Sequence, residues 1–374
     1  MTSRNNPLFA AQPCNTGRQM ELDIGKALPI LCLAFVHCTI ECCTDEQLLS
    51  GVPYLFDSVI GGPMSAPMFL FCMGATVHYS KTHSPAEMAR RGLRLILYGF
   101  LLNLCRFLVP YLIGYALTGD TEQFLVPLPY RIFGNDVLQF GGVAFLTLAL
   151  LMKLKTPKWA MLALSAVFSL VGTLLRGTDL GSDVLNIAGG WFLGTVNEAD
   201  QIISDFPLLN WLIIPVSGYC FGWLLQRVQD KKRFYLRFSP LLLVLAAVGF
   251  YFGIRYEIGM FGEGQNAYYH LYTHDALLCI ALTLGLLGVY AALAKVLPKQ
   301  IGRFFTYTSR NITAFYCIHW VFVRLITNVI LYAATGSQLL PVWATMLLSL
   351  GIVLVTFLTL RIYKTMRKKE VHVV

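Results

Sequence analysis

Long apolar runs are the feature that most constrains this sequence. Ten of them, each about 17 to 25 residues long, cover residues 23–43, 60–80, 93–118, 135–154, 157–175, 207–228, 238–257, 275–297, 312–334 and 340–363. A helix that crosses a hydrocarbon layer of about 30 Å needs about 20 such residues. A spanning segment must also satisfy its own backbone hydrogen bonds, which a helix does. The sequence therefore predicts an all-α, polytopic membrane helix bundle with about ten transmembrane helices.

The composition excludes an ordinary soluble protein. Hydrophobic residues make up 56% of the chain and charged residues 13%, about half of the roughly 25% usual in soluble domains. The ten cysteines lie mostly within apolar runs and form no CxxC pair, which indicates buried thiols and not a disulfide or zinc framework. We find no basic start with a short apolar core and a small-residue cleavage site, so we expect the first run to stay as a membrane helix.

The charged residues predict the orientation. If the N-terminus is cytoplasmic, 24 of the 29 Lys and Arg residues fall on the cytoplasmic side, and 15 of the 20 Asp and Glu residues fall on the outer side. Positive charge in short loops marks the cytoplasmic face. An even number of spans then places both termini in the cytoplasm. The net charge of +9 is explained by these loops, so no nucleic-acid partner is indicated.

The chain reads as one membrane domain with two short tails. No linker or internal repeat divides it, so we expect a polar N-terminal tail at 1–17, a single ten-span domain at 18–364 and a basic C-terminal tail at 365–374. The tails are predicted to be poorly ordered. The longest non-spanning stretch, 176–206, is either an ordered external loop or an interfacial, re-entrant element.

His37 is the first candidate for chemistry. An ionisable side chain within an apolar span is costly and is by default a functional hypothesis. Glu41 follows at i+4 and could accept a proton from one imidazole nitrogen, which would fix the tautomer of a general base. Lys26 precedes His37 by eleven residues, about 16 Å along the same helix face, next to Asp23. The alternative is a structural histidine bonded to a neighbouring helix.

Other polar residues indicate an anion site and a polar cavity. Arg90, Arg91 and Arg94 lie at the cytoplasmic entrance of the third run, where guanidinium groups could hold phosphates or could only anchor the topology. Arg106 lies within that run, and Asp136 is a possible partner on the same outer side. In the ninth run, polar side chains recur on successive turns at Asn311, Tyr316 and His319, with Arg324 deeper.

We expect no metal site. His270, His274 and Asp275 would have the spacing of a metal pair if helical, but such pairs are common by chance. The sequence also contains no Walker loop, GxSxG motif or Rossmann fingerprint.

Several segments resemble one family of membrane enzymes. LDIGKALPILCLAFVH (22–37) is similar to the LDxLRGLAxxxVxxxH opening of membrane acyltransferase family 3, and GGPMSAPMFLFCMGATV (61–77) is similar to its GxPLFFFLSGFxL segment. ARRGLRLILYGFLLNL, NDVLQFGGVAFLTLALL, DFPLLNWLIIPVSGYCFGWLL and SRNITAFYCIHWVF also resemble bacterial relatives of the heparan-α-glucosaminide N-acetyltransferases. The likeness extends through nearly the whole chain.

The resemblance implies an activity and its residues. Such enzymes move an acyl group, usually acetyl, from cytoplasmic acyl-CoA to an acceptor beyond the membrane, so acetyl-CoA is a co-substrate and no bound cofactor is expected. The family's Asp and His fall on Asp23 and His37, and its Arg falls on Lys26, which lacks the bidentate fork. The glucosaminide enzymes place their histidine after the first span, where Thr44–Val59 contains none here, so family 3 is favoured.

The implied mechanism places acyl-CoA at Lys26 and the three arginines. His37 would act as general base toward an acceptor hydroxyl or amine, or would carry the acyl group covalently, and both remain open. Asn311, Tyr316 or His319 could donate to the oxyanion. The expected partners are acyl-CoA, membrane lipid and an envelope glycan or small-molecule acceptor, and the expected location is a bacterial cell membrane.

Two other classes of protein compete with the enzyme. A transporter or flippase could line its cavity with Arg106, Asp136, Arg324 and the two histidines, since intramembrane charges also mark transport paths. Many transporters contain inverted repeats, and we see none in this sequence, which disfavours the transporter. A sensory or structural membrane protein without catalysis is the third possibility, if the lysine at position 26 marks a lost activity.

Overall fold

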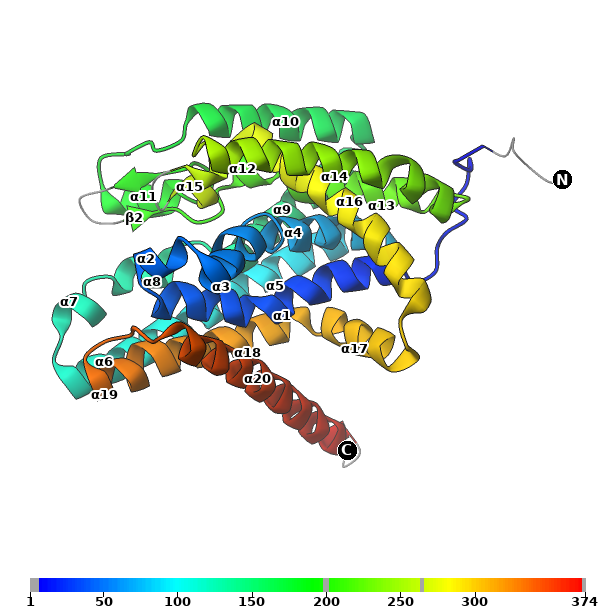
Figure 1. Cartoon of the computed structure of the whole chain (residues 1–374). Helices are drawn as coiled ribbons and strands as arrows, with labels where there is room; N and C mark the ends of the chain where they lie inside the picture. Colours follow the sequence, from blue (N-terminus) through cyan, green and yellow to red (C-terminus); the bar gives the residue numbers. More distant parts are fainter. Residues whose placement is uncertain (1–6, 198–201, 263–265, 372–374) are drawn as a thin grey trace. The chain divides into compact units, whose positions relative to one another are not determined.

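The computed structural model describes residues 7–197, 202–262 and 266–371 (Figure 1). Within these residues, nine helical segments are long and apolar enough to cross a membrane. They cover Met20–Cys42, Gly51–Tyr79, Pro85–Thr118, Thr121–Lys153, Leu208–Leu225, Lys231–Phe261, Thr273–Val296, Ile312–Thr335 and Val342–Met366. The remaining expected run, 157–175, corresponds to α10 (Lys158–Leu174), an apolar helix of 17 residues. The predicted all-α, polytopic bundle is confirmed.

Several spans are interrupted rather than single α-helices. The second contains α3 (Gly51–Tyr54), η1 (Leu55–Gly61), α4 (Ala66–Ala75) and η2 (Thr76–Tyr79), and it begins earlier than expected. The third contains α5 (Pro85–Asn103), η3 (Leu104–Leu108) and α6 (Val109–Thr118), so the three arginines at 90, 91 and 94 lie inside a helix and not ahead of it. The span Ile312–Thr335 contains α18 (Ile312–Arg324), η5 (Leu325–Leu331) and α19 (Tyr332–Thr335).

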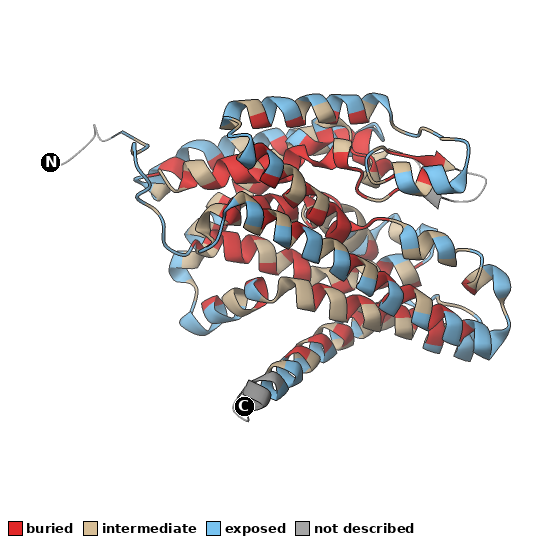
Figure 2. Ribbon diagram, turned by 180° about the vertical axis from the view of Figure 1, so that it is seen from behind, coloured by how far each residue is buried: buried red, intermediate tan, exposed pale blue. Residues whose placement is uncertain are grey.

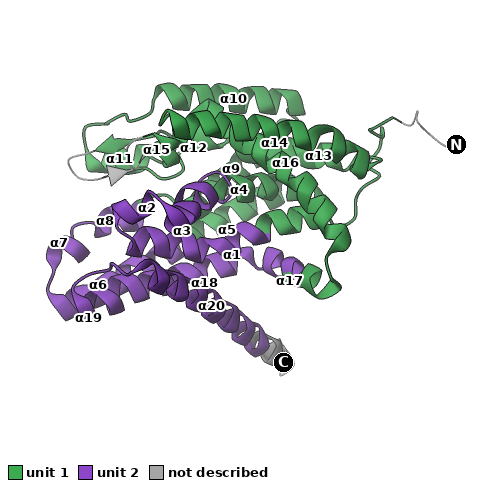
Figure 3. Ribbon diagram, in the orientation of Figure 1, with its two compact units in different colours: residues 1–26, 66–99, 134–304 green, residues 27–65, 100–133, 305–374 purple. Residues whose placement is uncertain are grey.

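The remaining elements complete the order of the chain. They are α1 (Met20–Cys42), α2 (Asp45–Leu48), α7 (Thr121–Phe124), α8 (Leu128–Phe133), α9 (Val137–Lys153), α11 (Asp183–Gly189), β1 (Val196–Asn197), β2 (Ile202–Ile203), α12 (Leu208–Trp211), α13 (Ile213–Leu225), α14 (Lys231–Arg255), η4 (Gly259–Phe261), α15 (Asn266–Tyr269), α16 (Thr273–Val296), α17 (Lys299–Arg310) and α20 (Val342–Val371). The chain forms two compact units (Figure 3). Unit 1 contains residues 1–26, 66–99 and 134–304, and unit 2 contains residues 27–65, 100–133 and 305–374.

Small residues let helices of unit 1 approach closely. A methyl group added at Gly74 of α4 would overlap the carbonyl oxygen of Pro215 in α13, and one added at Gly218 would overlap that of Phe71. Close backbone approach is how helices associate in lipid, where no hydrophobic force draws them together. Gly74 in the second span therefore allows α4 to approach α13 closely.

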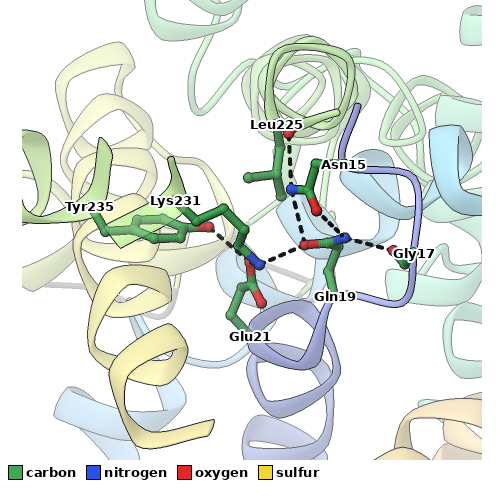
Figure 4. A network of polar contacts seen from close by, with 7 residues as sticks. All are labelled: Asn15, Gly17, Gln19, Glu21, Leu225, Lys231 and Tyr235. Carbon is green, nitrogen blue, oxygen red and sulfur yellow. Dashed lines mark hydrogen bonds and ion pairs between the residues drawn. The ribbon is translucent and has the colours of Figure 1, made fainter. Parts of the chain in front are cut away.

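The N-terminal segment of unit 1 is anchored to the turn between α13 and α14. Ala10 and Asn15 donate backbone hydrogen bonds to the carbonyl oxygens of Arg227 and Gln226. Figure 4 shows the next link, in which Lys231 contacts both Gln19 and Glu21 at the start of α1. The expectation of a poorly ordered tail is therefore wrong for residues 7–17, because these contacts hold them. The basic tail is likewise helical through Val371, while 1–6 and 372–374 lie outside the described residues.

The stretch 176–206 forms a small ordered element in its described part. Thr178 and Thr195 form an isolated parallel β-bridge, and β1 pairs antiparallel with β2. Asn186 of α11 donates a side-chain hydrogen bond to Asp179, which precedes the helix. Residues 198–201 lie outside the described residues. The outward faces of the long helices are apolar and exposed (Figure 2), as at Leu241, Val244 and Val248 of α14. This is the surface expected of helices that contact lipid.

Unit 2 contains three π-helical turns, η1, η3 and η5, among the described residues. A π-helical turn is rare and is found frequently at functional sites. Two of these turns lie at buried arginines: Arg106 is inside η3, and Arg324 is the residue that precedes η5.

Candidate active site

Two histidines and a tryptophan meet inside unit 2. The rings of His37 (α1) and His319 (α18) are nearly parallel, with 5.5 Å between their centroids. The indole of Trp320 covers a face of His37 at 3.8 Å. His319 and Trp320 are buried. The structure therefore brings together two of the sequence-predicted site residues, which are 282 positions apart in the chain.

The His319 ring is held by its own helix. Its Nδ1 lies 3.1 Å from the carbonyl oxygen of Phe315, which can only accept a hydrogen bond. Nδ1 therefore carries the proton, and in the neutral ring Nε2 carries the lone pair. Tyr316 contacts the same ring, with 5.4 Å between ring centroids. Phe315 is in turn packed against Phe357 of α20.

Two arginines also contact Trp320. The guanidinium carbons of Arg106 and Arg324 are 4.8 Å and 5.3 Å from the Trp320 ring centroid, and both also lie over Phe107. Arg324 donates from Nη1 to Glu41 at 2.7 Å. This buried pair links α1 to α18 next to the histidines.

Glu41 has a different partner from the one expected. Its carboxylate accepts from Arg324, and no hydrogen bond joins it to His37 in the part of the chain that the structure describes. The geometry therefore gives no support to Glu41 as the group that fixes the His37 tautomer. Glu41 instead compensates an arginine that would be costly to bury alone.

Several buried polar atoms in this cluster make no hydrogen bond to the described residues. Among them are Nε2 of His37, Nε1 of Trp320 and Nε of Arg324. An unsatisfied buried donor or acceptor costs about 1–3 kcal/mol, so it needs an explanation such as a catalytic role. The Trp320 ring contacts both His37 and Arg324.

The predicted donor-binding cations lie in unit 1. Asp23 accepts from Arg18 at 2.5 Å, one turn ahead of Lys26 on α1. On α5, Arg90 pairs with Glu87 at 2.7 Å, and Arg91 donates to Ser80 at 2.6 Å. Arg94 is exposed. Arg90 is also exposed, whereas Arg91 is half-buried, and phosphate binding by these arginines stays a prediction.

The other predicted residues have mixed surroundings. Asn311 donates to the carbonyl oxygen of Tyr307 at 2.7 Å at the start of α18, eight residues from His319. Asp136 caps α9 in unit 1, and Arg106 donates to Asn103 at 2.9 Å in unit 2. The Arg106–Asp136 pairing stays a prediction.

The histidine pair considered for a metal has structural partners. His270 is buried in unit 1 and its Nε2 lies 2.9 Å from the carbonyl oxygen of Ser204, while His274 lies beside Asp275 at 3.5 Å. No group of three or more His, Cys, Asp or Glu side chains suited to a metal ion occurs among the described residues.

Two residues of the cluster were not among the catalytic and binding residues predicted from the sequence. Trp320 directly follows His319, but a tryptophan in an apolar span reads first as packing or an interface anchor. From the sequence, Arg324 was assigned only to a deep position in its span and to the cavity of the alternative transporter. An arginine five residues after an intramembrane histidine is the signal that could have placed it in the site.

These features define a class of protein: a multi-pass membrane protein with a buried site of two imidazoles, an indole and paired charges. The family model described as an acyltransferase domain matches residues 20–361. The chain therefore belongs to membrane acyltransferase family 3, and it is a multi-pass membrane acyltransferase by family. No curated protein matches the chain. The resemblance to glucosaminide N-acetyltransferases stays a prediction.

Proposed function

We propose that the protein transfers an acetyl or other acyl group from cytoplasmic acyl-CoA to a hydroxyl or amine of an envelope glycan or related acceptor in a bacterial cell membrane, with His37 as base. The family supports acyl transfer. The donor, the acceptor and the role of His37 are our proposal. Acyl-CoA is a co-substrate in this scheme.

The observation that carries the proposal is the buried, unbonded Nε2 of His37 beside a second imidazole. A buried nitrogen without a hydrogen-bond partner costs free energy, and a substrate that forms a hydrogen bond with it would offset that cost. A neutral imidazole near pH 7 can accept the proton of an attacking hydroxyl or amine. It can also attack a thioester itself.

The surrounding groups fit the charge changes of acyl transfer. The thioester oxygen becomes negative as the acceptor attacks. The Trp320 indole N–H, which makes no hydrogen bond to the described residues, is a ready donor for that oxygen. This role was expected of Asn311, Tyr316 or His319. Trp320 is the better candidate because Asn311 already donates to Tyr307.

The cations on the cytoplasmic side fit the donor. CoA carries several phosphate charges, and Lys26, Arg90, Arg91 and Arg94 are all predicted to lie at that face. Lys26 is on the same helix as His37, eleven residues earlier. The helix α1 therefore connects a residue suited to bind the donor with a residue suited to the chemistry.

The test uses purified protein in lipid nanodiscs with radiolabelled acetyl-CoA. We expect CoA release that falls by about 10²–10⁴ in His37→Asn, the usual contribution of a general base. His83→Asn is the matched control, because His83 is exposed in a loop of unit 1. Equal rates in all three proteins would refute the role of His37. Solute uptake that does not depend on CoA would favour the transporter.

A further inference from the structure

The two histidines of the site are held differently. His319 is anchored through Nδ1 to the Phe315 carbonyl oxygen at 3.1 Å, so its tautomer and ring orientation are fixed. His37 makes no hydrogen bond to the described residues at Nε2 and is held by ring contacts with Trp320 and His319. An imidazole with a bonded Nδ1–H is the arrangement found in general bases, because the accepting nitrogen is then defined.

The spacing of the rings allows both to act on one acceptor. With 5.5 Å between centroids, one oxygen atom can lie within about 3 Å of a nitrogen of each ring. Trp320 covers one face of His37 at 3.8 Å, so a substrate must approach His37 at the ring edge. The charged and titratable groups around the pair in unit 2 are Tyr316, Arg106 and Arg324, with Glu41 engaged by Arg324.

We propose that His319 is a second catalytic residue: it is the base toward the acceptor, and His37 carries the acyl group between donor and acceptor. This assignment rests on the proposed acyl transfer, and it gives His37 the covalent role in place of the role of base. A buried, unbonded Nε2 suits a nucleophile when the ring carries its proton on Nδ1, and a tautomer fixed by a backbone carbonyl suits a base.

The steps balance without a further reactant. His37 Nε2 attacks the thioester carbon, the C–S bond breaks, and the departing thiolate takes the proton from Nδ1 of the acylated ring. The acceptor oxygen or nitrogen then attacks the acyl carbon while its proton moves to Nε2 of His319. The C–N bond to His37 breaks, and the proton on His319 passes to the departing imidazolate. Both histidines return to their neutral forms.

The test separates the two halves of the reaction. The variant His319→Asn keeps an amide N–H that can donate to the Phe315 carbonyl and removes the basic nitrogen. With radiolabelled acetyl-CoA and water as acceptor, we expect this variant to release about one equivalent of CoA in a burst and then turn over about 10²–10⁴ times more slowly. Label should accumulate on the protein, and His37→Asn should take up none. Added imidazole should speed deacylation of His319→Asn.

The outcomes distinguish this inference from the proposed function. If the wild-type protein turns over and His319→Asn has the same steady-state rate, the inference is overturned and the proposed function still stands. Wild-type turnover with no labelled protein in either form would also overturn it and would favour direct transfer. A wild-type protein that releases no CoA would overturn the proposed function and the inference together. His319→Gln and a thermal unfolding scan show whether any loss reflects misfolding, and a folded variant with full activity counts against the inference.

Discussion

Replacing Glu41 with glutamine tests the energetics of the buried ion pair. The carboxylate accepts from Arg324 at 2.7 Å, and the two side chains are 12% and 9% exposed. Removing one partner of a buried pair costs about 3–5 kcal/mol, because the other charge stays buried. Glutamine still offers a carbonyl oxygen to Arg324, and Asn328 accepts from the same nitrogen at 3.3 Å. We therefore expect a loss near the lower limit, about 3 kcal/mol of unfolding free energy.

The measurement is unfolding by SDS titration in mixed micelles, with Glu46→Gln as control. Glu46 is an exposed carboxylate on α2, and such surface changes stay within about 0.5 kcal/mol. Arg324→Met should also be destabilising. The double variant should lose less than the sum of the single losses, since neither charge is then left alone. A Glu41→Gln protein as stable as the control would refute the reasoning, as would strictly additive effects.

Three further predictions concern other parts of the chain. Gly218→Ala should lower the free energy of unfolding by about 1–3 kcal/mol, because the added methyl group forces α13 away from the Phe71 carbonyl. Gly351→Ala is the control, because a methyl group there meets no other atom and should not lower the stability. Equal stabilities of the two variants would contradict this prediction. Burial lowers the pKa of His270 to about 4, so the unfolded chain binds a proton below about pH 6.5 that the folded protein does not. Stability should therefore fall by up to about 3 kcal/mol between pH 6.5 and pH 4 in unfolding titrations, and His270→Gln should flatten that slope. Lys26→Met should raise the KM for acetyl-CoA at least about tenfold, because a contact with phosphate needs the positive charge. Lys26→Arg keeps the charge and should have a KM close to that of the wild type. An unchanged KM in Lys26→Met would exclude Lys26 from the donor site.

The sequence by itself determined the bundle. Runs such as 275–297 and 340–363 are long enough to span and too apolar to remain in water, so the helical membrane fold followed from length and composition. His37 was also found from sequence, because an ionisable group in such a run stands out. The boundaries were less accurate: α14 begins at Lys231 and not near 238, since a basic first turn can lie outside the hydrocarbon yet remain helical.

Only the tertiary structure decided which polar residues act together. The sequence suggested Glu41 as the partner of His37 because they are one turn apart, but Arg324, from a distant helix, takes that carboxylate. Neither the contact of His37 with Trp320 nor the π-helical turns at Arg106 and Arg324 can be read from periodicity. Helical spacing fixes neighbours on one helix, whereas contacts between helices depend on how their side chains pack, and that is set by the whole bundle.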